Sequence, residues 1–250
     1  ATCGTTALLA LSLGLLWLRL PNISRHNNHQ GQDAQKNGEL GRAEQLYNQA
    51  IALDEDNLDA HYNLGTLYED LQDTEKATTQ YLIAIQGDLP DAYNNLAHLY
   101  IQAATQTQDA ATQAKNQHQA IALLSQGLQL PAWQDSPSSV KYSFYKNLGW
   151  ARLLQDQPQV AQPLLENAIA ISEQTGANSV LNAGSAHCLL AQSLEAQDSS
   201  AALKSWQRCC QLATSANPNE DAWILEAQAK LKAKNYDPNA VCKPNAAPVS

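Results

Sequence analysis

The chain has 250 residues and a mass of 27.1 kDa, and 44% of its residues are hydrophobic, so it can bury a core and is not disordered throughout. Its 24 acidic residues against 15 basic ones give a net charge of −9, which opposes the phosphate neutralisation that supplies non-specific affinity for nucleic acids. Nucleic-acid binding is therefore excluded from the predicted functions. With one Phe and no Met, the core is predicted to pack through Ala, Leu, Ile and Val.

The N-terminal segment is strongly apolar. No charged side chain precedes Arg19, and residues 7–18 read ALLALSLGLLWL. Eighteen helical residues span about 27 Å, close to the roughly 30 Å hydrocarbon core of a bilayer. Leucines lie all round this helix rather than on one face, and no small-residue cleavage site follows it. Residues 1–20 are therefore predicted to be a single-pass membrane anchor. Downstream Arg25 and Lys36 favour the cytoplasmic side for the rest of the chain, and the sidedness stays open.

A short polar segment over residues 21–29 is predicted to be a linker. It contains His26 and His29 at the i, i+3 spacing of metal ligands, but no third ligand is evident nearby. No metal site is predicted.

A set of three residues recurs 34 residues further along the chain. In both copies the set is small–aromatic–small at positions i, i+4 and i+7, which lie on one face of a helix. The two copies are Ala43, Tyr47, Ala50 and Ala77, Tyr81, Ala84. A second helical pattern, with Asn before a Leu-Gly or Leu-Ala pair, occupies residues 61–68, 93–100 and 145–152. The sequence therefore predicts repeated pairs of helices.

These residues resemble the tetratricopeptide repeat family, whose unit of about 34 residues is a helix–turn–helix. The resemblance implies an all-α fold, a right-handed superhelical solenoid of antiparallel helix pairs. It covers residues 30–216 with about five repeats, of which the first and fifth are degenerate. The third carries an insertion of about eleven residues, whose Ala and Gln favour longer helices over a loop. In the best repeat, Gly65 and Ala77 let the two backbones approach closely, so a bulky side chain at either position is expected to overpack the contact.

The C-terminal part has a different pattern. Residues 217–234 are predicted to form one more amphipathic helix, which caps the C-terminal end of the solenoid. The hydrophobic helix of residues 1–20 is predicted to precede the solenoid at its N-terminal end. Residues 235–250 show no periodicity and are predicted to be a flexible tail.

The five cysteines do not follow the dense spacing of a disulfide-stapled module. Cys209 and Cys210 are adjacent, and a bridge between neighbours would be strained because their Cα atoms are about 3.8 Å apart. Two free thiols on a helix are predicted, and the redox compartment stays open.

Motifs of catalysis are missing from the sequence. It has no Gly-rich phosphate loop, no G-x-S-x-G elbow and no pattern that suggests a Ser, His and Asp set. The prediction is a non-catalytic protein without a cofactor, whose function lies in a binding surface.

The resemblance places that surface on the concave side, which the first helix of each pair lines. Asn63, Asn95 and Asn147 each precede the Leu-Gly or Leu-Ala pair. A carboxamide has a donor and an acceptor, so a row of them can hydrogen-bond the backbone of an extended peptide. Asn is also a common polar helix residue, and both interpretations stay open.

Further groove residues flank the asparagines. They are predicted to be Tyr62, Thr66, Glu69, Asn94, His98, Lys146 and Trp150. Acidic residues outnumber basic ones in the early repeats, which predicts a neutral or basic protein or peptide partner. Tyr62 and Thr66 stand where a clamp for a terminal carboxylate would need basic or amide residues, so such a clamp is disfavoured.

Together these features predict a membrane-anchored scaffold or assembly factor that holds a partner protein in its groove. The alternative is a regulatory or sensory module of a larger membrane enzyme, such as a protein kinase, whose catalytic part lies upstream. The intact mass of the native polypeptide distinguishes the two.

Overall fold

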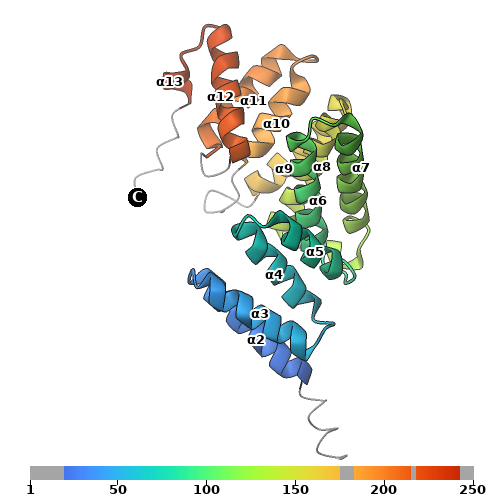
Figure 1. The fold of residues 1–250 in the computed structure, drawn as a ribbon. Coiled ribbons are helices and arrows are strands. Elements are labelled where there is room, and N and C mark those ends of the chain that lie inside the picture. The colour runs from blue at the N-terminus through green and yellow to red at the C-terminus, as the bar shows by residue number, and fades with distance from the viewer. Residues whose placement is uncertain (1–19, 175–182, 215–217, 243–250) are drawn as a thin grey trace, which may run out of the picture. The chain divides into compact units, whose positions relative to one another are not determined.

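Figure 1 shows the computed structural model, which describes residues 20–174, 183–214 and 218–242. Throughout this part of the chain the regular elements are helices, as the all-α prediction requires. They are α2 (Leu20–Lys36), α3 (Leu40–Leu53), α4 (Leu58–Asp70), α5 (Thr74–Ala84), α6 (Pro90–Gln106), α7 (Ala110–Gly127), the 3-10 turn η1 (Pro131–Trp133), α8 (Ser138–Leu154), α9 (Pro158–Gln174), α10 (Gly184–Leu194), α11 (Ser199–Leu212), α12 (Pro218–Ala233) and α13 (Pro238–Val241).

The contacts divide the chain into two compact units, residues 1–96 and 97–250, and the division falls inside α6. In the first unit α2 packs on α3 and α4 on α5, while α4 also contacts α2 and α3. In the second unit α8 packs on α9 and α10 on α11. Consecutive helices joined by short turns and packed together are the helical pairs that the repeat pattern predicts.

Small residues allow these pairs to pack closely. A β-carbon built on Gly65 would lie 2.6 Å from the Tyr81 ring, and one on Gly31 would lie 2.6 Å from the Tyr47 ring. Both rings are fully buried. The predicted close approach at Gly65 is therefore confirmed, because no side chain larger than hydrogen fits there without displacing a buried ring.

The turns inside three of the pairs share one backbone conformation. Gly38, Gln72 and Asp156 have φ values of 77°, 59° and 57°, in the left-handed region. Gly38 and Gln72 occupy the same point of successive pairs, one repeat apart. Only glycine adopts this conformation without steric cost, so the first pair has the better-suited residue.

The third pair contains α7, which is the longest helix that the structure describes. α6 has 17 residues and α7 has 18, and residues 107–109 alone separate them. The residues of the predicted insertion therefore lie in two helices and a short turn rather than in a long loop.

The expected linker at residues 21–29 differs in the structure, because α2 runs through it. Ser24 is fully buried, and its hydroxyl donates to the carbonyl of Ala50 at 2.7 Å. The Asn57 amide donates to the Ser24 hydroxyl, also at 2.7 Å. The segment is polar in sequence, yet these hydrogen bonds satisfy its buried groups and allow it to pack as the first helix of a pair.

The predicted membrane location requires a correction. Residues 1–19 of the proposed anchor lie outside the described residues, and Leu20 begins α2. Across residues 20–174, 183–214 and 218–242, none of the helices combines the length and the apolar character needed to cross a bilayer. The helix that follows the apolar run is polar and packs on α3, so the prediction of a single-pass membrane protein is not supported.

The second unit has its own core where α10, α11 and α12 meet. It contains Trp206, Ala227 and Leu231, each at most 1% exposed. α12 corresponds to the expected capping helix over 217–234, and α13 begins shortly beyond that range, at Pro238.

The cysteine prediction is wrong. The structure pairs Cys188 with Cys209 and Cys210 with Cys242, so the adjacent residues of α11 are not free thiols. Each of the two binds a distant cysteine rather than its neighbour, which avoids the strain of a vicinal bridge.

Candidate partner-binding surface

The first unit has a pocket of about 440 Å³ between the first helices of its two pairs. We call it the α2–α4 groove, and it is lined by Gln32, Gln35, Lys36, Tyr47, Asn63 and Asp70. Four of these six side chains carry an amide or a carboxylate, so the groove presents mainly hydrogen-bonding groups.

Asn63 joins the two helices of this groove. It is 8% exposed, and its amide donates to the Asn28 side-chain oxygen at 2.9 Å. The Thr66 hydroxyl donates to the Asn63 backbone carbonyl at 2.8 Å. Asn63 thus lines the groove and Thr66 bonds to it, and part of the hydrogen-bonding capacity of both residues is used within the protein.

A second set of bonds crosses the groove through Gln35. The Tyr47 hydroxyl donates to its side-chain oxygen at 2.8 Å, and its amide donates to the Asp70 carboxylate at 2.7 Å. Burial, reinforced by Asp70, raises the pKa of Tyr47 to about 12. The Tyr47 phenol therefore stays protonated and donates to the Gln35 side-chain oxygen. This orients the Gln35 side chain so that its NH2 group faces Asp70.

The same arrangement recurs one repeat later with a carboxylate in place of the amide. Glu69 and Tyr81 occupy the repeat positions of Gln35 and Tyr47, and the Tyr81 hydroxyl donates to the Glu69 carboxylate. Burial raises the pKa of Glu69, the Tyr81 hydrogen bond lowers it and the charge of Asp70 raises it further. Glu69 is therefore a half-buried carboxylate that would be stabilised by an added positive charge.

Three more predicted residues surround Tyr81. The Tyr62 ring lies 6.0 Å from the Tyr81 ring, and burial raises the pKa of Tyr62. The Asn95 amide donates to the Tyr81 hydroxyl at 3.2 Å, and the Asn94 amide donates to the Asn95 side-chain oxygen, also at 3.2 Å. The early groove residues thus belong to three hydrogen-bonded groups in the first unit, which are centred on Asn63, Gln35 and Tyr81.

The later groove residues gather in the second unit. Trp150 is buried, and its ring lies 5.9 Å from His98 and 5.1 Å edge-on from Trp223 of α12. Burial, followed by the charge of Lys146, lowers the pKa of His98 to about 3. Burial also lowers the pKa of Lys146, which the charge of Glu220 raises. α12 therefore contributes an acid and an indole to this cluster.

Asn147 belongs to the second unit as well and is 2% exposed. The predicted row of Asn63, Asn95 and Asn147 is thus divided between the two units. Asn63 lies at the α2–α4 groove, and Asn95 is bonded to Tyr81.

The chain is similar to known proteins in sequence over one segment and in fold over most of its length. Residues 35–72 match the family model described as TPR repeat. The solved structure of PilF from Pseudomonas aeruginosa is similar with a TM-score of 0.62 at 15% identity, over 86% of this chain and 87% of that one. YrrB, described as a TPR protein with an unusual peptide-binding site, gives a TM-score of 0.53 at 14% identity, over 84% and 91% of the two chains.

The fold is that of a TPR protein. PilW, described as a widely conserved type IV pilus biogenesis factor, also shares it, with a TM-score of 0.58 at 16% identity over 85% of this chain and 94% of that one. No curated protein sequence matches the chain. At these identities the similarity concerns the fold, and TPR folds generally serve as non-catalytic scaffolds for protein interactions.

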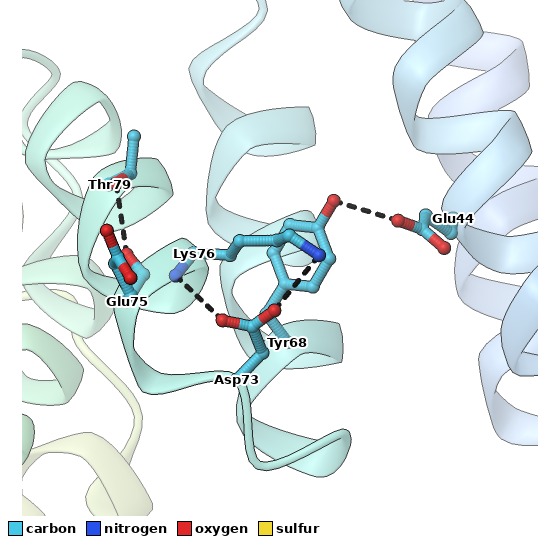
Figure 2. Close-up of polar contacts among 6 residues, drawn as sticks. All are labelled: Glu44, Tyr68, Asp73, Glu75, Lys76 and Thr79. Carbon is cyan, nitrogen blue, oxygen red and sulfur yellow. Dashed lines mark hydrogen bonds and ion pairs between the residues drawn. The ribbon is translucent and has the colours of Figure 1, made fainter.

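Another polar cluster connects consecutive TPR pairs of the first unit. Figure 2 shows the Tyr68 hydroxyl pointing at Glu44 of α3, 2.9 Å away, while the Lys76 ammonium lies 5.1 Å from the centre of the Tyr68 ring. Lys76 also pairs with Asp73 at 2.9 Å across exposed side chains, an interaction of small energetic value. Glu75, beside them on α5, is exposed. The buried Tyr68 thus has a partner for its hydroxyl and a cation beside its ring, while Glu75 lies on the surface nearby.

Sequence reasoning missed several of the residues that complete the TPR surface. Gln35 could have been found, because it occupies the same repeat position as Glu69, one repeat earlier. Trp223 and Glu220 could not, since the repeat period does not relate α12 to α8. Their place beside Trp150 and Lys146 depends on how α12 packs in the second unit.

Proposed function

We propose that the chain is a non-catalytic scaffold that binds an extended segment of a partner protein in the α2–α4 groove. The observation that carries the proposal is the pocket of about 440 Å³ lined by Gln32, Gln35, Asn63 and Asp70. Amide and carboxylate groups along one groove can pair with the N–H and C=O groups of an extended backbone whatever its side chains. The TPR fold supports this use, because scaffolding is its general role.

The charge of the first unit favours a neutral or basic partner. Asp70 lines the groove and is exposed, and Glu69 is its neighbour in the chain. Burial raises the pKa of Glu69 and of Asp91, so a cation placed near these carboxylates would favour their ionised form. Lys36 is the cation among the groove residues. A Lys or Arg side chain of the partner, directed toward Asp70 and Glu69, would supply the positive charge that these carboxylates favour.

Asn63 keeps a proposed role in binding. It lines the α2–α4 groove, and replacing it with Ala is expected to weaken capture of the partner. Because Asn63 also joins α2 to α4, this variant requires a measurement of stability beside the measurement of binding.

A cleaner test uses exposed acidic residues. Peptides are selected from a displayed random library on the full chain, and their affinity is then measured by fluorescence anisotropy for the chain with Asp70→Lys or Glu75→Lys. Both substitutions change the charge equally, but only Asp70 lines the groove. We expect neutral or basic peptides, about tenfold weaker binding for Asp70→Lys and less than about a twofold change for Glu75→Lys.

Two results would contradict the proposal. Selected peptides could bind both variants equally, or a photo-crosslinking side chain introduced at Gln32 could fail to label them while one at the exposed Thr79 does. Either result would place the binding surface outside the α2–α4 groove.

A further inference from the structure

Four cysteines lie together in the second unit. Cys188 is on α10, Cys209 and Cys210 are on α11, and Cys242 follows α13. The Cα atoms are 4.7 Å apart in the Cys188–Cys209 pair and 5.0 Å apart in the Cys210–Cys242 pair. Both separations lie within the range that a disulfide requires.

The adjacent cysteines of α11 serve different neighbours. Successive residues of a helix point about 100° apart, so two side chains in sequence cannot face the same helix. Cys209 accordingly meets α10, and Cys210 meets the segment that follows α12. Both cysteines of the Cys-Cys dipeptide can therefore be disulfide-bonded at the same time.

Three of the four cysteines are buried in the core of the unit, and Cys242 is half-buried. Cys188 and Cys209 are fully buried, and Cys210 is 6% exposed. They pack with Trp206, Ala227 and Leu231 in one apolar cluster. The Cys210–Cys242 pair encloses the whole of α12 between its two ends, so it joins the C-terminal helices covalently to α11.

We propose that this domain matures and works in an oxidising compartment, where both disulfides form. Each bond forms as two S–H bonds break, and the two protons and two electrons pass to a disulfide donor of the thiol–disulfide exchange class, whose S–S bond breaks to give a dithiol. Reducing compartments keep such thiols reduced, and extracytoplasmic ones let disulfides persist. The inference replaces the cytoplasmic side that downstream Arg and Lys residues favoured, and it does not depend on the proposed peptide binding.

The test is a thiol-trapping experiment on the full chain in the cells that naturally produce it. Cells are lysed in acid, free thiols are alkylated under denaturing conditions without reductant, and the peptides are mapped by mass spectrometry. We expect Cys188 linked to Cys209 and Cys210 linked to Cys242, with none of the four alkylated. A reduced parallel sample serves as the control, in which all four are alkylated.

Any other pattern overturns the proposal. Alkylation of all four cysteines would show that the chain resides in a reducing compartment. A bond between Cys188 and Cys242, or one bond without the other, would show that the two pairs do not form together as the structure places them.

Discussion

Gly65 and Tyr81 are in contact so close that a β-carbon on the glycine would lie 2.6 Å from the aromatic ring. Gly31 and Tyr47 show the same relationship in the preceding repeat, with the same distance. Each tyrosine also directs its hydroxyl to a groove residue of its own pair, Gln35 or Glu69. Each glycine therefore lets the tyrosine ring pack against the neighbouring helix, and so determines where its hydroxyl lies in the candidate binding surface.

Gly65→Ala is expected to lower the free energy of unfolding by about 1–3 kcal/mol, because the added methyl group overpacks a fully buried ring. Urea denaturation of the full chain measures this. Gly41→Ala is the matched control, since a β-carbon on that helical glycine meets nothing within 4 Å. It is expected to raise stability by up to about 1 kcal/mol. Equal effects of the two variants would contradict the packing argument.

Gln72→Gly is expected to raise the free energy of unfolding by about 0.5–1 kcal/mol, because Gln72 has a φ of 59° that costs a side-chain-bearing residue energy. Gly38→Ala makes the opposite change in the equivalent turn of the first pair. Its φ is 77°, and a β-carbon there would meet no atom within 4 Å, so any loss comes from the backbone conformation alone. We expect a loss of about 1 kcal/mol by thermal denaturation. Changes of the same sign in both variants would rule this explanation out.

Cys210→Ser and Cys242→Ser are each expected to lower the stability of the oxidised chain by about 2–4 kcal/mol, because either one opens the same covalent loop. The double variant should lose no more than a single one. Excess reductant opens the Cys188–Cys209 bond as well, so it should lower the stability of the unmodified chain at least as far as the variants. Losses that add in the double variant would instead indicate two independent packing contacts.

Acidification is expected to destabilise the second unit through the buried His187 and the half-buried His98. Burial and then the charge of Lys146 lower the pKa of His98 to about 3, while burial and then Arg208 lower that of His187 to about 4. Unfolded histidine titrates near 6.5, so from about pH 6.5 down to about pH 4 the unfolded chain binds protons that the folded chain does not. Stability therefore falls with pH in this window, by at most about 1.4 kcal/mol per pH unit for each histidine.

Urea titrations at several pH values across this window measure the slope. His187→Gln should flatten it, whereas the exposed His26→Gln should leave it unchanged. The raised pKa values of Glu69 and Asp91 act in the opposite sense as these carboxylates take up protons in the folded state, and the two-variant comparison cancels their contribution. An unchanged slope in His187→Gln would contradict the assignment.

The repeat pattern was enough to predict the helical pairs, because the spacing of Gly65, Ala77 and Tyr81 reports directly on which side chains must meet between two helices. The binding surface was predictable only in part. The position of Asn63 was expected, but its bond to Asn28 was not, since residue 28 was assigned to a linker on the ground of its polar neighbours. Polar residues can be buried when partners from other helices satisfy them, and one segment read alone does not show those partners.

The cysteines illustrate a second limit. The pairing of Cys209 and Cys210 with distant partners depends on how α10 and the segment after α12 pack on α11, and spacing along the chain contains no such information. The link from α12 to Trp150 was hidden for the same reason.

The two disulfides also determine how the chain responds to force. If the molecule is pulled from its ends, the segments between paired cysteines, which have sequence separations of 21 and 32 residues, cannot be stretched. At the reach of an extended chain, about 3.3–3.6 Å per residue, the oxidised protein would extend roughly 170 Å less than the reduced one. A load carried through the C-terminal end would thus pass along α11 from Cys209 to Cys210 and leave α12 unloaded.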